Sequence, residues 1–133
     1  MAKFGLSKEE RIKREKDFRL VYSVGKIVYS EDQKLKANFY FQKDSGQANI
    51  KIAAAVSKKA GNAVWRNRVK RLLRESYRLN KEIMADNCVN QKVCLKVIFS
   101  PNYLNQRKQK KLKLDDIMPA VIDIMKKING RLL

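Results

Sequence analysis

Basic residues in the middle of this sequence are spaced so that they can bind phosphate groups. Between Lys58 and Arg78 there are eight basic residues and one acid, Glu75. Arg71, Arg74 and Arg78 recur at spacings of three and four, which places them on one face of a helix. Guanidinium groups on one rigid face can each bind a phosphate in a forked geometry. A merely solvated helix normally mixes both signs of charge, so this stretch favours nucleic-acid contact.

Hydrolytic chemistry by the protein itself is not indicated. The sequence contains no histidine, which excludes Ser-His-Asp triads, Cys-His pairs and His-ligated metals. Its 13 acids are scattered, and the few adjacent pairs suit helix ends or a tail rather than a metal cluster. We therefore expect no catalytic residue and no metal site in this chain.

Composition points to one domain, residues 1–133, with a polyanionic partner. The formal net charge is +18 on 133 residues, and 44% of the residues are hydrophobic, enough for a core. The segment 51–113 holds 17 basic residues and three acids. Residues 1–12 carry charges of alternating sign near their end, and we expect them to form a flexible tail.

The sequence gives no sign of a membrane segment or of secretion. No apolar run approaches about 18 residues, and the first residues lack the hydrophobic stretch of a signal peptide. Cys88 and Cys94 lack the paired spacing of a zinc site and are expected to be reduced. We expect a cytoplasmic protein that is monomeric on its own and binds neither membrane nor DNA.

Periodicity predicts the order α-β-β-β-α-β-α. Apolar residues at helical spacing predict helices, and β-branched or alternating runs predict strands. The predicted helices are 15–24, 62–82 and 116–128, the predicted strands are 27–30, 37–42, 49–56 and 92–99, and the predicted turns or loops include 43–47 and 86–91. Gly25 is expected to end the first helix, and Pro119 to lie in the first turn of the last. Runs of strands separated by helices favour an α+β two-layer sandwich with a four-stranded sheet.

The central helix is expected to have two different faces. Asn62 is a plausible N-cap, and the preceding Lys58, Lys59 and Gly61 form an exposed positive turn beside the free N–H groups of the helix start. A stripe at helical spacing is mainly apolar and is expected to face the core; it consists of Trp65, Val69, Leu72, Leu73, Ser76, Leu79 and Ile83.

The motif at 56–71 resembles a known family. Val56-Ser57-Lys58-Lys59-Ala60-Gly61-Asn62-Ala63-Val64, followed by Arg66-Asn67-Arg68-Val69-Lys70-Arg71, is similar to the Arg-Asn-Arg region of the bacterial ribonuclease P protein component. Lys16-Asp17-Phe18, Val21-Tyr22 and Gly25-Lys26 resemble that family's pattern in the first helix. The resemblance spans about residues 11–100.

The resemblance implies a fold and a role. The family fold is an α-β sandwich with a left-handed βαβ crossover, similar to a domain of ribosomal proteins. The family's protein is the small subunit of an endoribonuclease whose RNA subunit cleaves the 5′ leader from precursor tRNA. It binds the RNA subunit and the leader. Magnesium would be held mainly by RNA, and the protein alone would not be catalytic.

The resemblance also implies two groups of RNA-binding residues. The leader cleft would contain Phe18, Tyr22 and Lys51, whose aromatic members could stack on unpaired bases or could simply pack in the core. The motif and its turn, which would bind the catalytic RNA, supply Ser57, Lys58, Lys59, Asn62, Arg66, Asn67, Arg68, Lys70, Arg71, Arg74 and Arg78. Asn67 could instead hold the helix start.

Residues 101–113 are longer and more basic than the family's usual connection. We expect a flexible loop with some nonspecific RNA contact. A ribosomal or other structural RNA-binding protein would explain the charge but not the order of the motif, and a self-sufficient nuclease is disfavoured by the missing histidine.

Overall fold

The computed structural model describes residues 7–43 and 48–132. Within them the chain forms a four-stranded sheet, four α-helices and two short 3₁₀-helices. The helices are α1 (Glu15–Val24), α2 (Ala63–Leu79), α3 (Glu82–Gln91) and α4 (Leu114–Arg131), with 3₁₀ turns η1 (Lys8–Glu10) and η2 (Lys58–Ala60). The strands are β1 (Lys26–Tyr29), β2 (Leu35–Lys43), β3 (Asn49–Ala54) and β4 (Val93–Pro101). The predicted α+β class and four-stranded sheet are confirmed.

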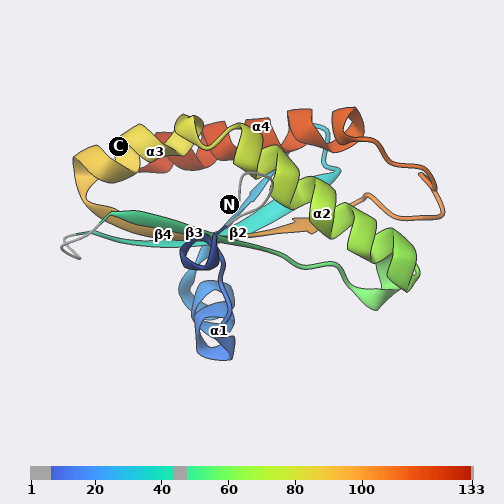
Figure 1. The fold of residues 1–133 in the computed structure, drawn as a ribbon, viewed down its shortest axis with the longest axis horizontal. Coiled ribbons are helices and arrows are strands. Elements are labelled where there is room, and N and C mark those ends of the chain that lie inside the picture. The colour runs from blue at the N-terminus through green and yellow to red at the C-terminus, as the bar shows by residue number, and fades with distance from the viewer. Residues whose placement is uncertain (1–6, 44–47, 133) are drawn as a thin grey trace.

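The sheet has the order β1-β2-β4-β3, so the last strand in the sequence lies inside it. β4 pairs antiparallel with β2 and parallel with β3. The helices α2, α3 and α4 cover one face, and α1 lies on the other (Figure 1). The face under α2 and α4 carries the main core, which includes Phe39, Leu73, Val97, Phe99 and Ile124.

α1 packs on the second face of the sheet, against β2 and β4. A second, smaller cluster of buried residues lies on this face, Ile12, Val21 and Ile98, and Phe18, Ala53 and Ala55 pack against it. Gly25 ends α1, as predicted, and its N–H bonds the carbonyl of Val21 at 2.9 Å. A side chain at Gly25 would put a Cβ 2.6 Å from the Phe39 carbonyl oxygen, so glycine is needed where α1 meets β2.

The predicted helix 62–82 and loop 86–91 are wrong in part. The helix predicted over 62–82 is α2, and it ends at Leu79, where the Asn80 side chain donates to the Ser76 carbonyl at 2.8 Å. A separate helix, α3, then occupies the stretch predicted as a loop. α3 buries Met84 and Cys88, which lie four residues apart on one face. Its asparagines are poor helix formers, so packing rather than propensity makes this helix.

The last helix also begins earlier than predicted. Asp116 accepts a hydrogen bond from the Lys113 N–H at 2.7 Å, which places the helix start at Leu114. Pro119 therefore lies inside α4 rather than in its first turn. The strands differ from the predicted ranges by one or two residues at several ends. The predicted turn 43–47 lies almost wholly outside the described residues.

Residues 7–12 have a defined place, which differs from the flexible tail expected for residues 1–12. Ile12 is buried and its N–H donates to the carbonyl of Ile52 at 2.9 Å, while Arg11 forms a parallel bridge with that strand. This segment thus lies along the free edge of β3. Among residues 7–43 and 48–132, no helix has both the length and the apolar character that crossing a bilayer requires.

Candidate nucleic-acid interface

An N-cap fixes the start of α2 and hence the direction of its basic face. The Asn62 side chain accepts the Trp65 N–H at 2.9 Å, as the sequence predicts for an N-cap. Trp65, Val69 and Leu73 are buried on the side that faces the sheet and α4. Tyr77 completes this stripe, whereas Leu79, which the periodicity places in it, is 45% exposed. The opposite side of α2 is consequently free to carry charge.

The arginines of α2 differ in what they contact. Arg66 donates to the carbonyl of Gly61 at 3.1 Å, and Arg68 donates through Nε to the carbonyl of Leu112 at 2.7 Å. These two bonds hold the turn before α2 and the segment before α4 against the helix. Arg78 forms a two-point ion pair with Glu75, so its charge is largely balanced.

A groove on α2 is lined by arginines that form no ion pair with the described residues. It has a volume of about 480 Å³ and is lined by Val64, Asn67, Arg68, Arg71 and Arg74. The pKa of Arg74 is lowered by burial, and then by the like charges of Arg11 and Arg71. Repulsion of this kind is relieved by a bound anion, so the groove suits phosphate groups.

Two residues that bear on this groove were not expected from the sequence: Val64, which lines it, and Arg11, whose charge acts on Arg74. Arg11 comes from the segment before α1, whose place at the edge of β3 is a long-range contact that periodicity does not reveal. Val64 is 79% exposed and follows the N-cap directly. The Asn67 side chain is exposed and makes no hydrogen bond with the described residues, and Asn62 is the residue that caps the helix. Lys70 is half-buried on the same helix.

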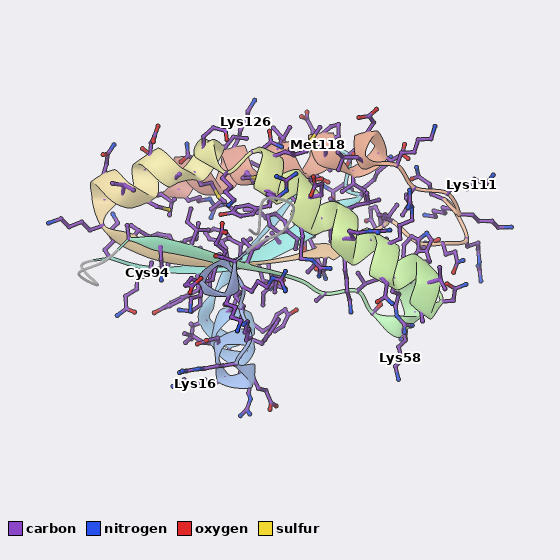
Figure 2. The ribbon with its side chains drawn as sticks, in the orientation of Figure 1. Lys16, Lys58, Cys94, Lys111, Met118 and Lys126 are labelled. Atoms are coloured by element: carbon purple, nitrogen blue, oxygen red, sulfur yellow. The ribbon has the colours of Figure 1, made fainter. Side chains whose placement is uncertain are left out.

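The second feature is a cleft on the sheet face that carries α1. It has a volume of about 590 Å³ and lies between α1, the sheet and the turn before α2. Its lining residues come from segments far apart in the sequence and are Tyr22, Ile27, Lys36, Asn38, Ala55, Val56, Ser57, Lys59, Ala60, Ser100, Pro101, Asn102, Leu104 and Asn105. Lys58 is exposed in the same turn, at the end of the molecule where α2 begins (Figure 2).

The three residues predicted for a leader cleft are separated by the structure. Tyr22 lines the cleft and is 50% exposed, and its partial burial raises the pKa of its hydroxyl. Phe18 is half-buried against the small cluster of Val21 and Ile98 and does not line the cleft. Lys51 lies beside Lys96 in the sheet, also outside the cleft lining. One helix face therefore holds both a packing residue and a cleft residue.

Asn38 is a cleft residue that the sequence analysis did not single out. It is 7% exposed, lines the cleft, and its side chain makes no hydrogen bond with the described residues. No fully buried side-chain polar atom in those residues lacks a partner, so the amide of Asn38 must reach the cleft surface. The alternation of β2, which puts Asn38 on the face opposite Phe39, was the available signal.

The described residues contain no group of three or more acidic or cysteine side chains that could hold a metal ion. Cys88 is buried, and burial raises the pKa of its thiol to about 11. The side chains of the site thus supply cations, an aromatic ring and amides. Such groups bind and orient a polyanion, and the site has the character of a binding surface.

Comparison with known proteins identifies the family to which this chain is related. A family model described as Ribonuclease P matches residues 6–119. The chain is 35% identical over 122 residues to the "Ribonuclease P protein component" of Clostridium novyi. This match covers 92% of this chain and 96% of that protein. It is 39% identical over 79 residues to the protein of the same name from Staphylococcus carnosus, which covers 59% of this chain and 65% of that one.

A solved structure shares the fold. The RNase P protein from Thermotoga maritima superposes with a TM-score of 0.68, at 22% sequence identity, over 89% of this chain and 96% of that one.

Proposed function

Because the chain belongs to the ribonuclease P protein family, we propose that it is the protein subunit of a ribonuclease P holoenzyme, where it binds the RNA subunit and the 5′ leader of precursor tRNA. The observation that carries the proposal is the presence of two different surface features whose residues suit a polyanion. The groove on α2 is lined by arginines, and the cleft on the other side of the sheet combines an aromatic ring with amides.

The α2 groove is the proposed contact with the RNA subunit. Arg71 and Arg74 have no acidic partner among the described residues, and Arg11 adds a third positive charge nearby. Guanidiniums in a partly buried groove form charge-assisted hydrogen bonds with phosphates. A folded RNA offers closely spaced phosphates, which such a groove can bind simultaneously.

The cleft is the proposed site for the leader. Unpaired bases can stack on the exposed ring of Tyr22, and the amide of Asn38 can hydrogen-bond to a base edge. Lys59 and Lys36 can neutralise the phosphates between those bases. A double helix would not present its bases to a ring in this way, so the cleft favours a single strand.

The chemistry of cleavage is proposed to belong to the RNA subunit, with Mg²⁺ held mainly by RNA phosphates. The chain has no histidine, and its described acidic residues form no cluster suited to a metal. The protein's contribution is to hold the substrate's leader and to offset repulsion between two large RNAs. That contribution increases affinity without a catalytic side chain.

Reconstitution tests this proposal. The protein is mixed with a bacterial ribonuclease P RNA and precursor tRNA at low magnesium, and release of the 5′ leader is measured. We expect the protein to stimulate cleavage and to be inactive without the RNA subunit. Absence of stimulation would contradict the proposal and would leave a structural RNA-binding role as the better account. Cleavage by the protein alone would indicate a nuclease of its own.

A further inference from the structure

The segment that joins β4 to α4 is a second ordered basic surface. Residues 101–113 were expected to form a flexible loop, but hydrogen bonds hold the part that follows β4, residues 102–113, at both ends and in the middle. Residues 102–113 are the basic loop. The N–H of Asn102 donates to the carbonyl of Lys34 at 2.7 Å, and that of Gln106 donates to the carbonyl of Ala60 at 2.7 Å. The side chain of Leu104, within this loop, is buried.

The start of α2 fixes the rest of the basic loop. The indole N–H of Trp65 donates to the carbonyl of Gln109 at 3.0 Å, and the side-chain oxygen of Gln106 accepts the N–H of Asn62 at 2.8 Å. Leu112 is buried, and its carbonyl accepts a hydrogen bond from the Arg68 side chain. These hydrogen bonds fix the backbone of the loop, so the positions of its remaining side chains along α2 are set.

Those remaining side chains are cationic and aromatic. Five exposed basic residues occur without an acid, and none forms an ion pair with the described part of the chain; they are Arg107, Lys108, Lys110, Lys111 and Lys113. Tyr103 is 60% exposed, and the Lys108 ammonium lies 5.8 Å from the centre of its ring. An exposed ring beside a lysine, on a segment that carries further basic residues, is a combination that single-stranded RNA binds by stacking and phosphate contact.

The basic loop is continuous with the cleft. Asn102, Leu104 and Asn105 of the basic loop line the cleft, and Tyr103 lies between the first two in the chain with its own ring exposed. Figure 2 shows Lys58 and Lys111 at the same end of the molecule, on either side of the start of α2. A single strand in the cleft that runs toward Leu104 and Asn105 therefore comes to the basic loop.

We propose that the basic loop binds the leader of precursor tRNA where the single strand leaves the cleft, with a base stacked on Tyr103 and phosphates on Lys108, Lys110 and Lys111. The proposal rests on the proposed function, because it extends the same substrate beyond the cleft. It adds a contact that depends on the length of the leader. A leader too short to leave the cleft does not reach this surface.

The test compares holoenzymes that carry wild-type protein, a loop variant and a control. The loop variant combines Tyr103→Ala with Lys108→Gln, Lys110→Gln and Lys111→Gln, all at exposed positions. The control removes three charges elsewhere, at exposed Lys43, Lys126 and Arg131, by substitution with glutamine. Circular dichroism verifies folding, and single-turnover titrations give the affinity for tRNA with a long leader, with a trimmed leader and with none.

We expect the loop variant to bind long-leader tRNA about tenfold more weakly, with little change for trimmed-leader or mature tRNA and no change in assembly with the RNA subunit. Tyr103→Phe alone should keep wild-type affinity, because the ring is retained. Unchanged long-leader affinity in the loop variant would overturn the proposal. An equal loss for mature tRNA, or weaker assembly, would overturn it by assigning the loop to the tRNA body or the RNA subunit.

The same titration separates this proposal from the proposed function. A wild-type holoenzyme that prefers leader-bearing tRNA supports the proposed function whatever the loop variant does. A wild-type holoenzyme without that preference would overturn both.

Discussion

The carboxylate of Glu10 forms an ion pair with Lys81, with 2.6 Å between Oε2 and Nζ. This contact joins the segment before α1 to the junction of α2 and α3, although 70 residues separate the two in the chain. Together with the bond from Ile12 to Ile52, it holds Arg11 close enough to repel Arg74. The edge of β3 and the α2 groove are therefore coupled through one short segment.

Glu10 should make stability depend on pH in the acid range. Burial alone would raise the pKa of Glu10, but hydrogen bonds from Lys81 and Ser7 outweigh it and lower the pKa below 4.5. The stabilisation is present above pH 4.5 and is lost as pH falls through the lower folded-state pKa. We expect Glu10→Gln to cost about 0.5–1 kcal/mol at neutral pH, given the partial exposure of the pair, and less in acid. Urea unfolding measures this.

Glu9→Gln is the matched control, because Glu9 is exposed and forms no ion pair with the described residues. It removes the same charge one residue away. Identical pH profiles of unfolding for the two variants would show that the ion pair with Lys81 does not stabilise the fold.

The two ends of the α2 face should contribute differently to RNA binding. Arg71 lies in the groove without an acidic partner among the described residues, whereas Arg78 is paired with Glu75. We expect Arg71→Ala to weaken holoenzyme assembly and to lower the log–log salt slope by about one. Arg78→Ala should have a clearly smaller effect on both. Equal effects of the two variants, measured by filter binding at several salt concentrations, would contradict this assignment.

Substitutions of Tyr22 and of Phe18 should affect different properties, leader binding in one case and fold stability in the other. Tyr22→Ala removes a half-exposed ring from the cleft and should weaken binding of leader-bearing tRNA by about 1–3 kcal/mol, with little loss of fold stability. Phe18→Ala removes packing from the small cluster and should instead lower the free energy of unfolding. Tyr22→Phe keeps the ring and should bind like wild type. A greater loss of leader binding in Phe18→Ala at temperatures where it stays folded would reverse these roles.

Local signals in the sequence predicted the local features of the site. Asn62 caps α2 as its residue type indicates, and the register of Trp65 and Val69 set which face is buried. α3 was not predicted, because Met84 and Cys88 are the buried residues that its described face offers and several of the others are weak helix formers.

The cleft depends on pairings between distant segments, which periodicity does not contain. Alternation places Lys51 on the correct sheet face but does not reveal that it lies beside Lys96, away from the cleft. Helical spacing groups Phe18 with Tyr22 but cannot tell which of them the sheet covers. The order of strands decides both, and strand order is a non-local property.

The Asn38 side chain gives the most direct test of the cleft. Its amide makes no hydrogen bond with the described residues and must reach the cleft surface, so its bonding capacity is available to a ligand. We expect Asn38→Ala to reduce affinity for leader-bearing tRNA by up to about tenfold, the value of one hydrogen bond, with unchanged affinity for mature tRNA. The free energy of unfolding should change little, because no internal hydrogen bond is lost.

Asn87→Ala serves as the control for this change. Asn87 donates to the side chain of Asn129 at 2.8 Å, between α3 and α4 and away from the cleft lining. Its substitution should lower the free energy of unfolding by about 1 kcal/mol and leave tRNA binding unchanged, which is the opposite pattern. If Asn38→Ala instead destabilises the fold without weakening leader binding, the amide has a structural role and the floor of the cleft does not contact RNA.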